Sequence, residues 1–450
     1  MFLRTSYKLF LLMLLISSCS IQQKLSSSAD VFFLKESSMS SSHIGIAVFD
    51  PVQNKNIFSH QADKLFVPAS NTKIVTCYAA MKYLPTKLPA AYLTENENAV
   101  LITPTGDPSF LQPDFNGHPL FEKLKSIDKP LYIQQDNWKS DALAGGWSWE
   151  DYSEEYMTER SAFPVYGNQI NWYQEKSKKE NPTYPGDTID VFIYSNPEVD
   201  WPVNFSSIKK NKFEVTRDQY QNAFTLFEGS QASAKTSIPY ITNGIETGIN
   251  LLKDSLSKTI IIADESMIKK FSSLKKDTIF SQSTDSLLKI MMHRSDNFYA
   301  DQSLIMVSQQ RFQQLDESAI IKEMLSNDLS GFPQQPHWVD GSGLSRYNLF
   351  SPDDMIYVLN KMRMEQPWER IKTIFPTVGT GTLTRFESKN GKFIYAKTGS
   401  MGGVMNLSGY VYTEKKKWLI FSIMINNTQT PFSTIRKQMN GFLERVAEIY

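Results

Sequence analysis

The sequence has few of the residues on which metal sites and disulfide frameworks depend. It contains 2 cysteines, Cys19 and Cys77, and only 5 histidines among 450 residues. No Cys-x-x-Cys pair occurs, and no two histidines have the spacing of a zinc-protease helix. A glycine-rich phosphate loop of the Walker type is also absent. We therefore expect no metal and no cofactor, and a disulfide framework is excluded if Cys19 belongs to a processing signal.

An excess of charge of one sign is lacking as well. Lys and Arg together number 47, and Asp and Glu together number 47, so the formal net charge is zero. Nothing global therefore indicates a nucleic-acid partner. The hydrophobic content of 41% and aromatic content of 12% are typical of a well-packed globular protein. A chain of 450 residues is long for one core, which favours two or more domains.

The first 19 residues have the pattern of an export signal. Arg4 and Lys8 precede an apolar run at 9–16 that is too short to cross a bilayer as a mature helix. Ile-Ser-Ser-Cys at 16–19 resembles a bacterial lipobox, so we expect Cys19 to carry a lipid that anchors the exported, periplasmic protein to a membrane. The alternative is ordinary cleavage nearby with an incidental cysteine. The serine-rich residues 20–42 are expected to form a flexible tether.

Alternation of apolar residues and the turn residues that separate them predict the order of elements. Residues 43–50 and 55–60 read as a strand pair, and a helix follows Ser70. Residues 94–245 contain short strand-like runs separated by Pro, Gly, Asn and Asp, which is typical of a mostly β insert. After the insert, the predicted helices are 245–255, 285–292, 298–310 and 432–450, and the predicted strands are 392–397, 406–413 and 418–426.

Ser70 and Lys73 stand three residues apart in the stretch Pro-Ala-Ser-Asn-Thr-Lys at 68–73. Residues three apart share a helix face, so the hydroxyl and the ammonium can meet. A serine needs a base beside it to become a nucleophile, and a lysine can serve once burial or a neighbouring cation lowers its pKa. The free N–H groups at a helix start can stabilise an oxyanion. The same spacing also fits a helix start with a solvated lysine, so the pair alone is a weak signal.

Two later segments strengthen that signal. Ser295-Asp296-Asn297 lies between two predicted helices, and Lys397-Thr398-Gly399-Ser400 ends a predicted strand. The order Ser-x-x-Lys, Ser-x-Asn, Lys-Thr-Gly is the signature set of penicillin-binding proteins and serine β-lactamases. The chain therefore resembles that superfamily. The resemblance implies an α+β fold, in which an antiparallel sheet is flanked by helices and joined to a helical subdomain.

Within the superfamily, the chain resembles the class C low-molecular-mass penicillin-binding proteins, which are D-alanyl-D-alanine carboxypeptidase/endopeptidases of the penicillin-binding protein 4 type. The stretches that carry the resemblance are GDPSF at 106–110, GWSWED at 146–151, SDNFYAD at 295–301, DGSGLSRYNL at 340–349 and AKTGSMGGVMNLSGYV at 396–411. That family inserts extra domains between its first two motifs. We therefore expect a transpeptidase-like catalytic domain made of 43–93 and 246–450, interrupted by a β-rich insert at 94–245.

The resemblance implies a cell-wall hydrolase that acts on peptidoglycan stem peptides and is acylated by β-lactams. Ser70 is expected to attack the carbonyl of a D-Ala-D-Ala bond or a D-amino-acid cross-link, with Lys73 as the base. Ser295 would relay the proton to the leaving amine, close to Lys73 and Lys397. Asn297 would hold the backbone amide of the substrate. These five residues are the catalytic set that the resemblance implies.

The resemblance also implies a substrate-binding set of Thr398, Gly399, Ser400, Met401 and Asp136. Lys397, Thr398 and Ser400 would bind the terminal carboxylate, a task that suits a cation with hydroxyl donors beside it. The backbone N–H groups of Ser70 and Ser400 would form the oxyanion hole. Asp136 and Met401 match the positions that read the diamino-acid side chain in the family. The family usually has two aspartates at the first of these places, where this chain has one, and the alternative for Asp136 is a turn residue.

Two other functions remain open at this point. A β-lactamase would share Ser70 and Lys73 but would deacylate β-lactams quickly. A non-catalytic scaffold or sensor would bind penicillin without turnover. The long insert disfavours the first of these, and the presence of every motif residue disfavours the second.

Overall fold

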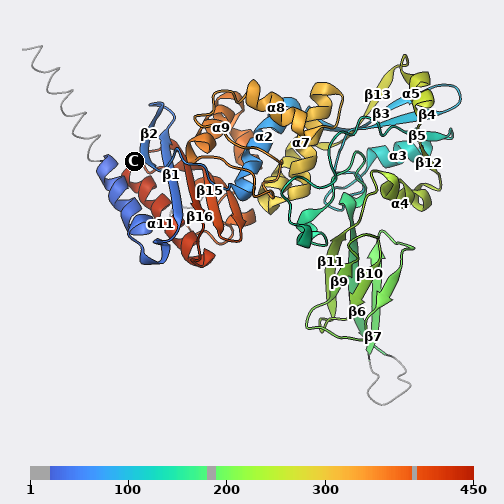
Figure 1. Ribbon diagram of the computed structural model, residues 1–450, viewed down its shortest axis with the longest axis horizontal. Coiled ribbons are helices and arrows are strands. Elements are labelled where there is room, and N and C mark those ends of the chain that lie inside the picture. The colour runs from blue at the N-terminus through green and yellow to red at the C-terminus, as the bar shows by residue number, and fades with distance from the viewer. Residues whose placement is uncertain (1–20, 180–188, 388–392) are drawn as a thin grey trace, which may run out of the picture. The chain divides into compact units, whose positions relative to one another are not determined.

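The computed structural model describes residues 21–179, 189–387 and 393–450 (Figure 1). Its contacts divide the chain into two compact units. The first unit contains the described residues up to 82 together with 288–296 and 321–450. The second unit contains the described residues of 83–287 together with 297–320. Helices α6 (Thr284–Ile290) and α8 (Glu317–Ser326) contain boundaries between the units.

The first unit is built on an antiparallel sheet of five strands in the order β14-β15-β16-β1-β2. Its strands are β1 (His43–Asp50), β2 (Lys55–His60), β14 (Ile394–Met401), β15 (Val404–Tyr412) and β16 (Trp418–Asn426). The register sets Ile46 opposite Ile423, and Ile423 opposite Leu407. The N-terminal and C-terminal parts of the chain therefore build one sheet, and side chains at alternate positions form one apolar face.

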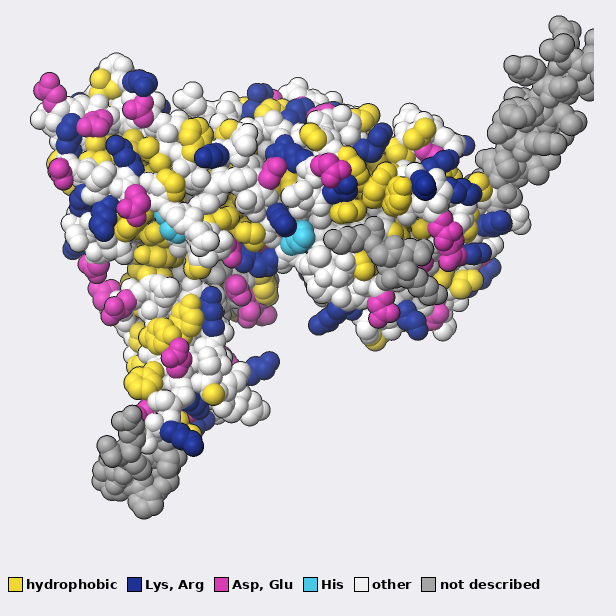
Figure 2. Space-filling view, turned by 180° about the vertical axis from the view of Figure 1, so that it is seen from behind, with side chains coloured by type: hydrophobic (Ala, Val, Ile, Leu, Met, Phe, Trp, Pro, Cys, Tyr) yellow, Lys and Arg dark blue, Asp and Glu magenta, His cyan; other side chains and the backbone are white. Residues whose placement is uncertain are grey.

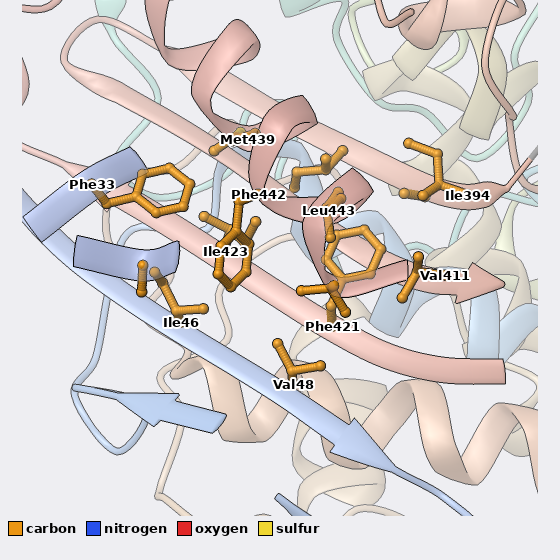
Figure 3. Packing of buried hydrophobic residues seen from close by; sticks show 14 of the residues in the cluster. Phe33, Ile46, Val48, Ile394, Val411, Phe421, Ile423, Met439, Phe442 and Leu443 are labelled. Carbon is orange, nitrogen blue, oxygen red and sulfur yellow. The ribbon is translucent and has the colours of Figure 1, made fainter. Parts of the chain in front are cut away.

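Helices cover both faces of this sheet. On one face, α11 (Phe432–Ile449) packs Met439, Phe442 and Leu443 against Ile46 and Phe421 of the strands (Figure 3). On the other face lie α2 (Thr72–Tyr83) and α9 (Pro352–Glu365), and the Tyr410 hydroxyl donates to the Leu359 carbonyl at 2.8 Å. The shorter helical segments are η1 (Asp30–Leu34), η2 (Ser37–Met39), η3 (Ala69–Asn71), η7 (Met291–Ser295), α10 (Trp368–Ile374) and η8 (Gly381–Leu383).

Residues 21–34 are helical and belong to the core of the first unit. Leu25, Ala29 and Phe33, four residues apart, are buried on one helix face, and the Phe33 ring lies 5.4 Å from that of Phe442. The prediction of a flexible tether over 20–42 is therefore wrong for 21–42. The serine content of this segment masked an apolar spacing that gives a packed helix. The predicted signal at 1–19, its Cys19 and residue 20 lie outside the described residues.

We expect Phe33→Ala to lower the free energy of unfolding by about 3 kcal/mol, because it removes a fully buried ring and leaves a cavity. Denaturant unfolding of the full chain measures this change. Val31→Ala is the matched control, since Val31 is 67% exposed in the same helical segment, and it should change stability by less than about 0.5 kcal/mol. Equal small effects of the two substitutions would mean that the segment does not pack on the sheet.

The described residues of the second unit form three sheets. The largest has the order β12-β5-β4-β3-β13, and two three-stranded sheets, β11-β6-β7 and β8-β10-β9, share one apolar core around Trp172, Phe224 and Tyr240. The strands are β3 (Lys87–Glu95), β4 (Val100–Pro104), β5 (Leu131–Ile133), β6 (Gln169–Lys178), β7 (Ile189–Asn196), β8 (Val203–Phe205), β9 (Glu214–Arg217), β10 (Phe224–Phe227), β11 (Ser233–Pro239), β12 (Ile260–Ile262) and β13 (Lys276–Ser283). The helical segments are α3 (Pro119–Ser126), η4 (Trp149–Asp151), η5 (Glu155–Met157), η6 (Tyr166–Asn168), α4 (Glu246–Leu256), α5 (Glu265–Phe271) and α7 (Asn297–Phe312).

The predicted insert, 94–245, falls within this second unit, which extends beyond it on both sides. Strand β3 begins before residue 94 and pairs with both β4 and β13, so 83–93 and 246–287 also belong to the second unit. The bounds of the unit are set by strand pairing between distant segments. The change in composition near residues 94 and 245 does not indicate this pairing.

The surface charges agree with a formal net charge of zero. On the face that Figure 2 shows, Lys and Arg side chains are interspersed with Asp and Glu side chains, without a large area of one sign.

Across 21–179, 189–387 and 393–450, none of the helices combines the length and the apolar character needed to cross a bilayer.

Candidate active site

The turn that carries Ser70 joins a short 3₁₀ segment, η3, to helix α2 in the first unit. Ala69 has a φ of +46°, an unfavourable value for a residue with a side chain, and Ser70 follows it half-buried. Lys73 is fully buried one turn into the helix. Its Nζ lies 2.9 Å from the Ser70 Oγ and donates to the Ser342 carbonyl oxygen at 2.7 Å. The structure therefore places a candidate nucleophile and a candidate base in hydrogen-bond contact.

Buried polar side chains of β15 hold this turn on the sheet. The Asn406 amide donates to the carbonyl oxygens of Val67 and Pro68, at 2.9 and 2.8 Å. The Asn71 amide donates to the Ser408 Oγ at 2.7 Å. These contacts satisfy buried groups and fix the strained backbone before Ser70. The motifs do not indicate these contacts, although the polar residues at 406 and 408 inside an otherwise apolar strand are a signal of them.

A second hydroxyl–ammonium pair lies in the same unit. Ser295 ends the η7 turn with a φ of +64°, and its Oγ accepts a hydrogen bond from the Lys397 Nζ at 2.8 Å. Lys397 lies on β14 and also donates to the Thr398 carbonyl oxygen at 2.8 Å. The Thr398 hydroxyl donates to the Thr382 Oγ1 at 2.8 Å, a partner that the sequence analysis did not identify. Segments from three distant parts of the sequence thus supply the two pairs.

The two lysines interact electrostatically. Burial, and after it the positive charge of Lys73, hold the pKa of Lys397 well below its ordinary value. Both ammonium groups are fully buried, and a low dielectric strengthens the repulsion between like charges. A site of this kind favours the loss of one proton from the pair, which is what a lysine base requires.

The loop at 340–348 shapes one wall of this site. The buried Asp340 carboxylate accepts hydrogen bonds from the backbone N–H groups of Gly343 and Ser345, both at 2.7 Å, and from the Asn348 amide at 2.8 Å. The Thr76 hydroxyl of α2 donates to the Gly341 carbonyl oxygen at 2.6 Å. These bonds aim the Ser342 carbonyl at Lys73. In the sequence this stretch carries the family resemblance, and its contact with the ammonium group depends on the fold.

Gly399 allows β14 to pass close to the Ser70 turn. A Cβ at this position would lie 2.4 Å from the Pro68 carbonyl oxygen, 2.9 Å from the Asn71 nitrogen and 3.1 Å from the Ser70 nitrogen. All three atoms belong to backbone and cannot move aside cheaply. The glycine therefore has a steric reason in the structure, in addition to the substrate-binding role that the resemblance implies.

We expect Gly399→Ala to slow acylation by a labelled penicillin about 100-fold or more. The added methyl group displaces the backbone of the Ser70 turn, and a small displacement of the Ser70 oxygen from the β-lactam carbonyl carbon slows the attack strongly. Pre-steady-state labelling measures the rate, and circular dichroism checks that the chain folds. Gly145→Ala is the control, since nothing lies within 4 Å of a Cβ there. An unchanged rate in Gly399→Ala would contradict the close approach.

The remaining predicted residues lie at several places. Asn297 begins α7 in the second unit, two residues after Ser295, and its amide donates to the Tyr156 carbonyl oxygen at 2.9 Å. Asp136 is exposed in a turn after β5 of the second unit. Ser400 and Met401 end β14 in the first unit, beside Lys397 in sequence. Their predicted roles, and those of the motif residues above, remain predictions.

Among the described residues, no group of three or more His, Cys, Asp or Glu side chains is arranged to hold a metal ion. The chemistry available at the two pairs is that of hydroxyl and amine groups.

Comparison with curated proteins gives a consistent picture. The chain is similar to the D-alanyl-D-alanine carboxypeptidase DacB of Haemophilus influenzae, with 24% identity over 428 residues, which is 86% of this chain and 86% of the relative. It is also similar to the penicillin-sensitive carboxypeptidase A of Dictyostelium discoideum, with 22% identity over 83% of this chain and 80% of that one.

Among solved structures, penicillin-binding protein 4 of Haemophilus influenzae matches with a TM-score of 0.69 and 20% identity, covering 90% of this chain and 97% of that one. The same protein in complex with a β-lactam matches with a TM-score of 0.67 and 18% identity, over 96% and 99% of the two chains. These likenesses show the fold and agree with the predicted α+β class.

The model of one peptidase family matches residues 25–446, which is most of the chain. Together with the relatives above, this match confirms the predicted relationship to penicillin-binding proteins of type 4. It also confirms the prediction that the chain is a serine-type D-Ala-D-Ala carboxypeptidase. The chain belongs to the D-Ala-D-Ala carboxypeptidase 3 (S13) family.

Proposed function

We propose that this protein hydrolyses the terminal D-Ala-D-Ala bond of peptidoglycan stem peptides, or their D-amino-acid cross-links, through an acyl-enzyme on Ser70. The observation that carries the proposal is the 2.9 Å contact between the Lys73 Nζ and the Ser70 Oγ, in a unit that also holds the Ser295–Lys397 pair. A serine, an adjacent buried amine and a second hydroxyl–amine pair are the parts that acyl transfer requires.

In the acylation step, the neutral Lys73 amine takes the proton from the Ser70 hydroxyl as the oxygen attacks the substrate carbonyl carbon. The backbone N–H groups of Ser70 and Ser400 stabilise the resulting oxyanion. Ser295 then passes a proton to the leaving amine, and the proton that Lys73 gained restores the Ser295 hydroxyl through the paired lysines. The C–N bond breaks, D-alanine or the cross-linking amine leaves, and the peptide remains as an ester on Ser70.

In the second step, water attacks the ester carbonyl and Ser70 is released. The amine that served as base in acylation takes a proton from this water, and the Ser70 oxygen recovers one as it leaves. The product is a stem peptide that is shorter by one residue, or a pair of stems that are no longer joined.

Substrate binding is assigned to residues next to these pairs. Lys397, Thr398 and Ser400 would bind the terminal carboxylate, and Gly399 would let the peptide approach the strand. Asn297 would hold the substrate backbone. Asp136 and Met401 would read the side chain of the stem-peptide diamino acid.

Digestion of purified muropeptides tests the activity. Monomeric pentapeptide and cross-linked dimer are incubated with the protein, and the products are separated by chromatography and identified by mass spectrometry. We expect loss of the terminal D-alanine or of the cross-link. Intact substrates, with no adduct on the protein, would favour the scaffold or sensor instead.

We also propose that β-lactams acylate Ser70, as the complex of the Haemophilus protein with a β-lactam suggests for this chain. Labelled penicillin should remain bound for minutes. Rapid release of hydrolysed penicillin would favour the β-lactamase.

We further propose that the chain is exported, processed before Cys19, and anchored to a bacterial membrane by a lipid on that residue. Cys19→Ser should move the protein from the membrane fraction to the soluble fraction, because a thioether-linked lipid needs the thiol. Fractionation followed by immunoblotting measures this shift. Membrane retention of Cys19→Ser would exclude the lipid anchor.

A further inference from the structure

A polar cleft in the second unit, away from the residues described above in sequence, has the chemistry of a ligand site. It has a volume of about 830 Å³, which is within the roughly 300–1,000 Å³ of small-molecule sites. Residues of helix α4, of the segment after β7, and of the loops before β10 and after β11 line it. We call it the α4 cleft and define it by Asn196, Glu198, Asp200, Trp201, Asn250 and Asp254.

The frame of the α4 cleft is fixed by contacts of its own. The Asn222 side chain donates to the Ile241 carbonyl at 3.0 Å and accepts from the Ile241 N–H at 2.8 Å. The Thr247 hydroxyl of α4 donates to the same Ile241 carbonyl at 2.8 Å. The ring of Trp201 stacks on Phe224, with centroids 5.9 Å apart and planes 14° apart. The cleft is therefore preformed, which lowers the entropy cost of binding.

The polar side chains that define the cleft are available to a ligand. Asn196, Glu198, Asp200, Asn250 and Asp254 are exposed. Among the described residues, no hydrogen bond or ion pair occupies their side-chain amide and carboxylate groups. Planar amides and carboxylates can bind neighbouring hydroxyls or an acetamido group in pairs, and the half-buried Trp201 offers an amphipathic ring.

Charge and polarity narrow the class of ligand. Three carboxylates, Glu198, Asp200 and Asp254, and one ammonium group, that of Lys253, belong to the residues that line the cleft. This balance disfavours polyanions such as phosphate polymers. The amide and carboxylate lining disfavours purely apolar ligands, because their binding would leave polar groups without partners. A neutral ligand rich in hydroxyl and amide groups fits best.

We propose that the α4 cleft binds the glycan of peptidoglycan, a neutral chain of N-acetylated amino sugars. The identity of the polymer rests on the proposed function, because the stem peptides that Ser70 would cleave are carried on such a chain. Binding of the glycan raises the local concentration of the attached stem peptides at the enzyme. It should therefore speed hydrolysis of stem peptides on the polymer and leave hydrolysis of a free peptide unchanged.

The probe for the test is the β-1,4-linked tetramer of N-acetylglucosamine, and calorimetry measures its binding to the full chain. The variant Asn250→Ala/Asp254→Ala removes two side chains on α4 and keeps a good helix former at both positions. We expect its Kd for the tetramer to rise about tenfold, as the loss of about 1.4 kcal/mol of hydrogen bonding gives. The control, Asn98→Ala/Asp128→Ala, removes an exposed amide and carboxylate elsewhere in the second unit and should bind as the parent does.

Activity on two substrates separates this proposal from the proposed function. The cleft variant should hydrolyse a sugar-free D-Ala-D-Ala peptide with unchanged kcat/KM and should cleave intact peptidoglycan more slowly. Absence of tetramer binding by the parent, equal affinity in the cleft variant, or preference for an anionic polymer would overturn the glycan site. Tetramer binding without any peptide hydrolysis would leave the saccharide site standing and would count against the proposed function alone.

Discussion

Ser70→Ala is expected to lower the rate of D-alanine release from a D-Ala-D-Ala peptide by about 10³-fold or more. The substitution removes the oxygen that forms the acyl-enzyme, and water without an activated nucleophile is a poor substitute. Lys73 keeps its hydrogen bond to the Ser342 carbonyl oxygen, so the fold around the buried ammonium should persist. Release of D-alanine, followed by a coupled assay, measures the rate.

The control for this prediction is Ser59→Ala. Ser59 is an exposed serine on β2 of the same unit and should be replaceable without loss of rate. Penicillin labelling gives a second readout, since Ser70→Ala should show none. Retention of both hydrolysis and labelling in Ser70→Ala would remove Ser70 from the mechanism.

Lys397→Met is expected to abolish most of the activity and to stabilise the folded protein. Activity should fall about 10²-fold or more, because the Ser295 hydroxyl loses its partner at 2.8 Å and the carboxylate of the substrate loses its cation. Stability should rise by about 1–3 kcal/mol, because an apolar side chain of similar volume replaces a buried amine whose charged form burial and Lys73 disfavour.

The pH dependence of stability follows from the lowered pKa of Lys397. Between its folded-state pKa and the unfolded value of 10.5, the unfolded chain binds more protons than the folded chain. The free energy of unfolding therefore rises with pH across that window, and the destabilisation is fully present below the folded-state pKa. Lys397→Met should flatten this rise.

Denaturant unfolding at several pH values tests the second prediction, with Lys55→Met as the control. Lys55 is an exposed lysine on β2, so its replacement should change neither the activity nor the slope with pH. A loss of stability in Lys397→Met together with an unchanged slope would mean that Lys397 carries an ordinary charge in the folded state.

Local patterns in the sequence predicted much of the sheet. The apolar patterns at 43–50, 55–60 and 418–426 gave the same bounds as β1, β2 and β16. Nearly every residue of β16 is buried, so a continuous apolar run marks that strand. The strand expected at 392–397 instead continues through Met401, since pairing with β15 holds Lys397 to Met401 where no alternation exists. The helix at 21–34 was missed because its serines obscured the four-residue spacing of Leu25, Ala29 and Phe33.

In the candidate active site too, contacts within one helical turn were predictable and contacts between distant segments were not. Motif spacing was enough to expect Ser70 beside Lys73, because both lie within one helical turn. It could not indicate the Asn406 contacts to the Ser70 turn or the Ser342 carbonyl on Lys73, which join residues more than 250 positions apart. The positive φ angles of Ala69 and Ser295 could not be predicted either, because alanine and serine rarely adopt such angles.

The most direct measurement locates the acyl group. The protein is incubated with a β-lactam, digested, and mapped by tandem mass spectrometry. The adduct is predicted on the Ser70 oxygen, in the peptide that contains 68–73, and it should be absent from Ser70→Ala. An adduct on any other residue, or equal labelling of Ser70→Ala, would contradict the proposal that Ser70 is the nucleophile.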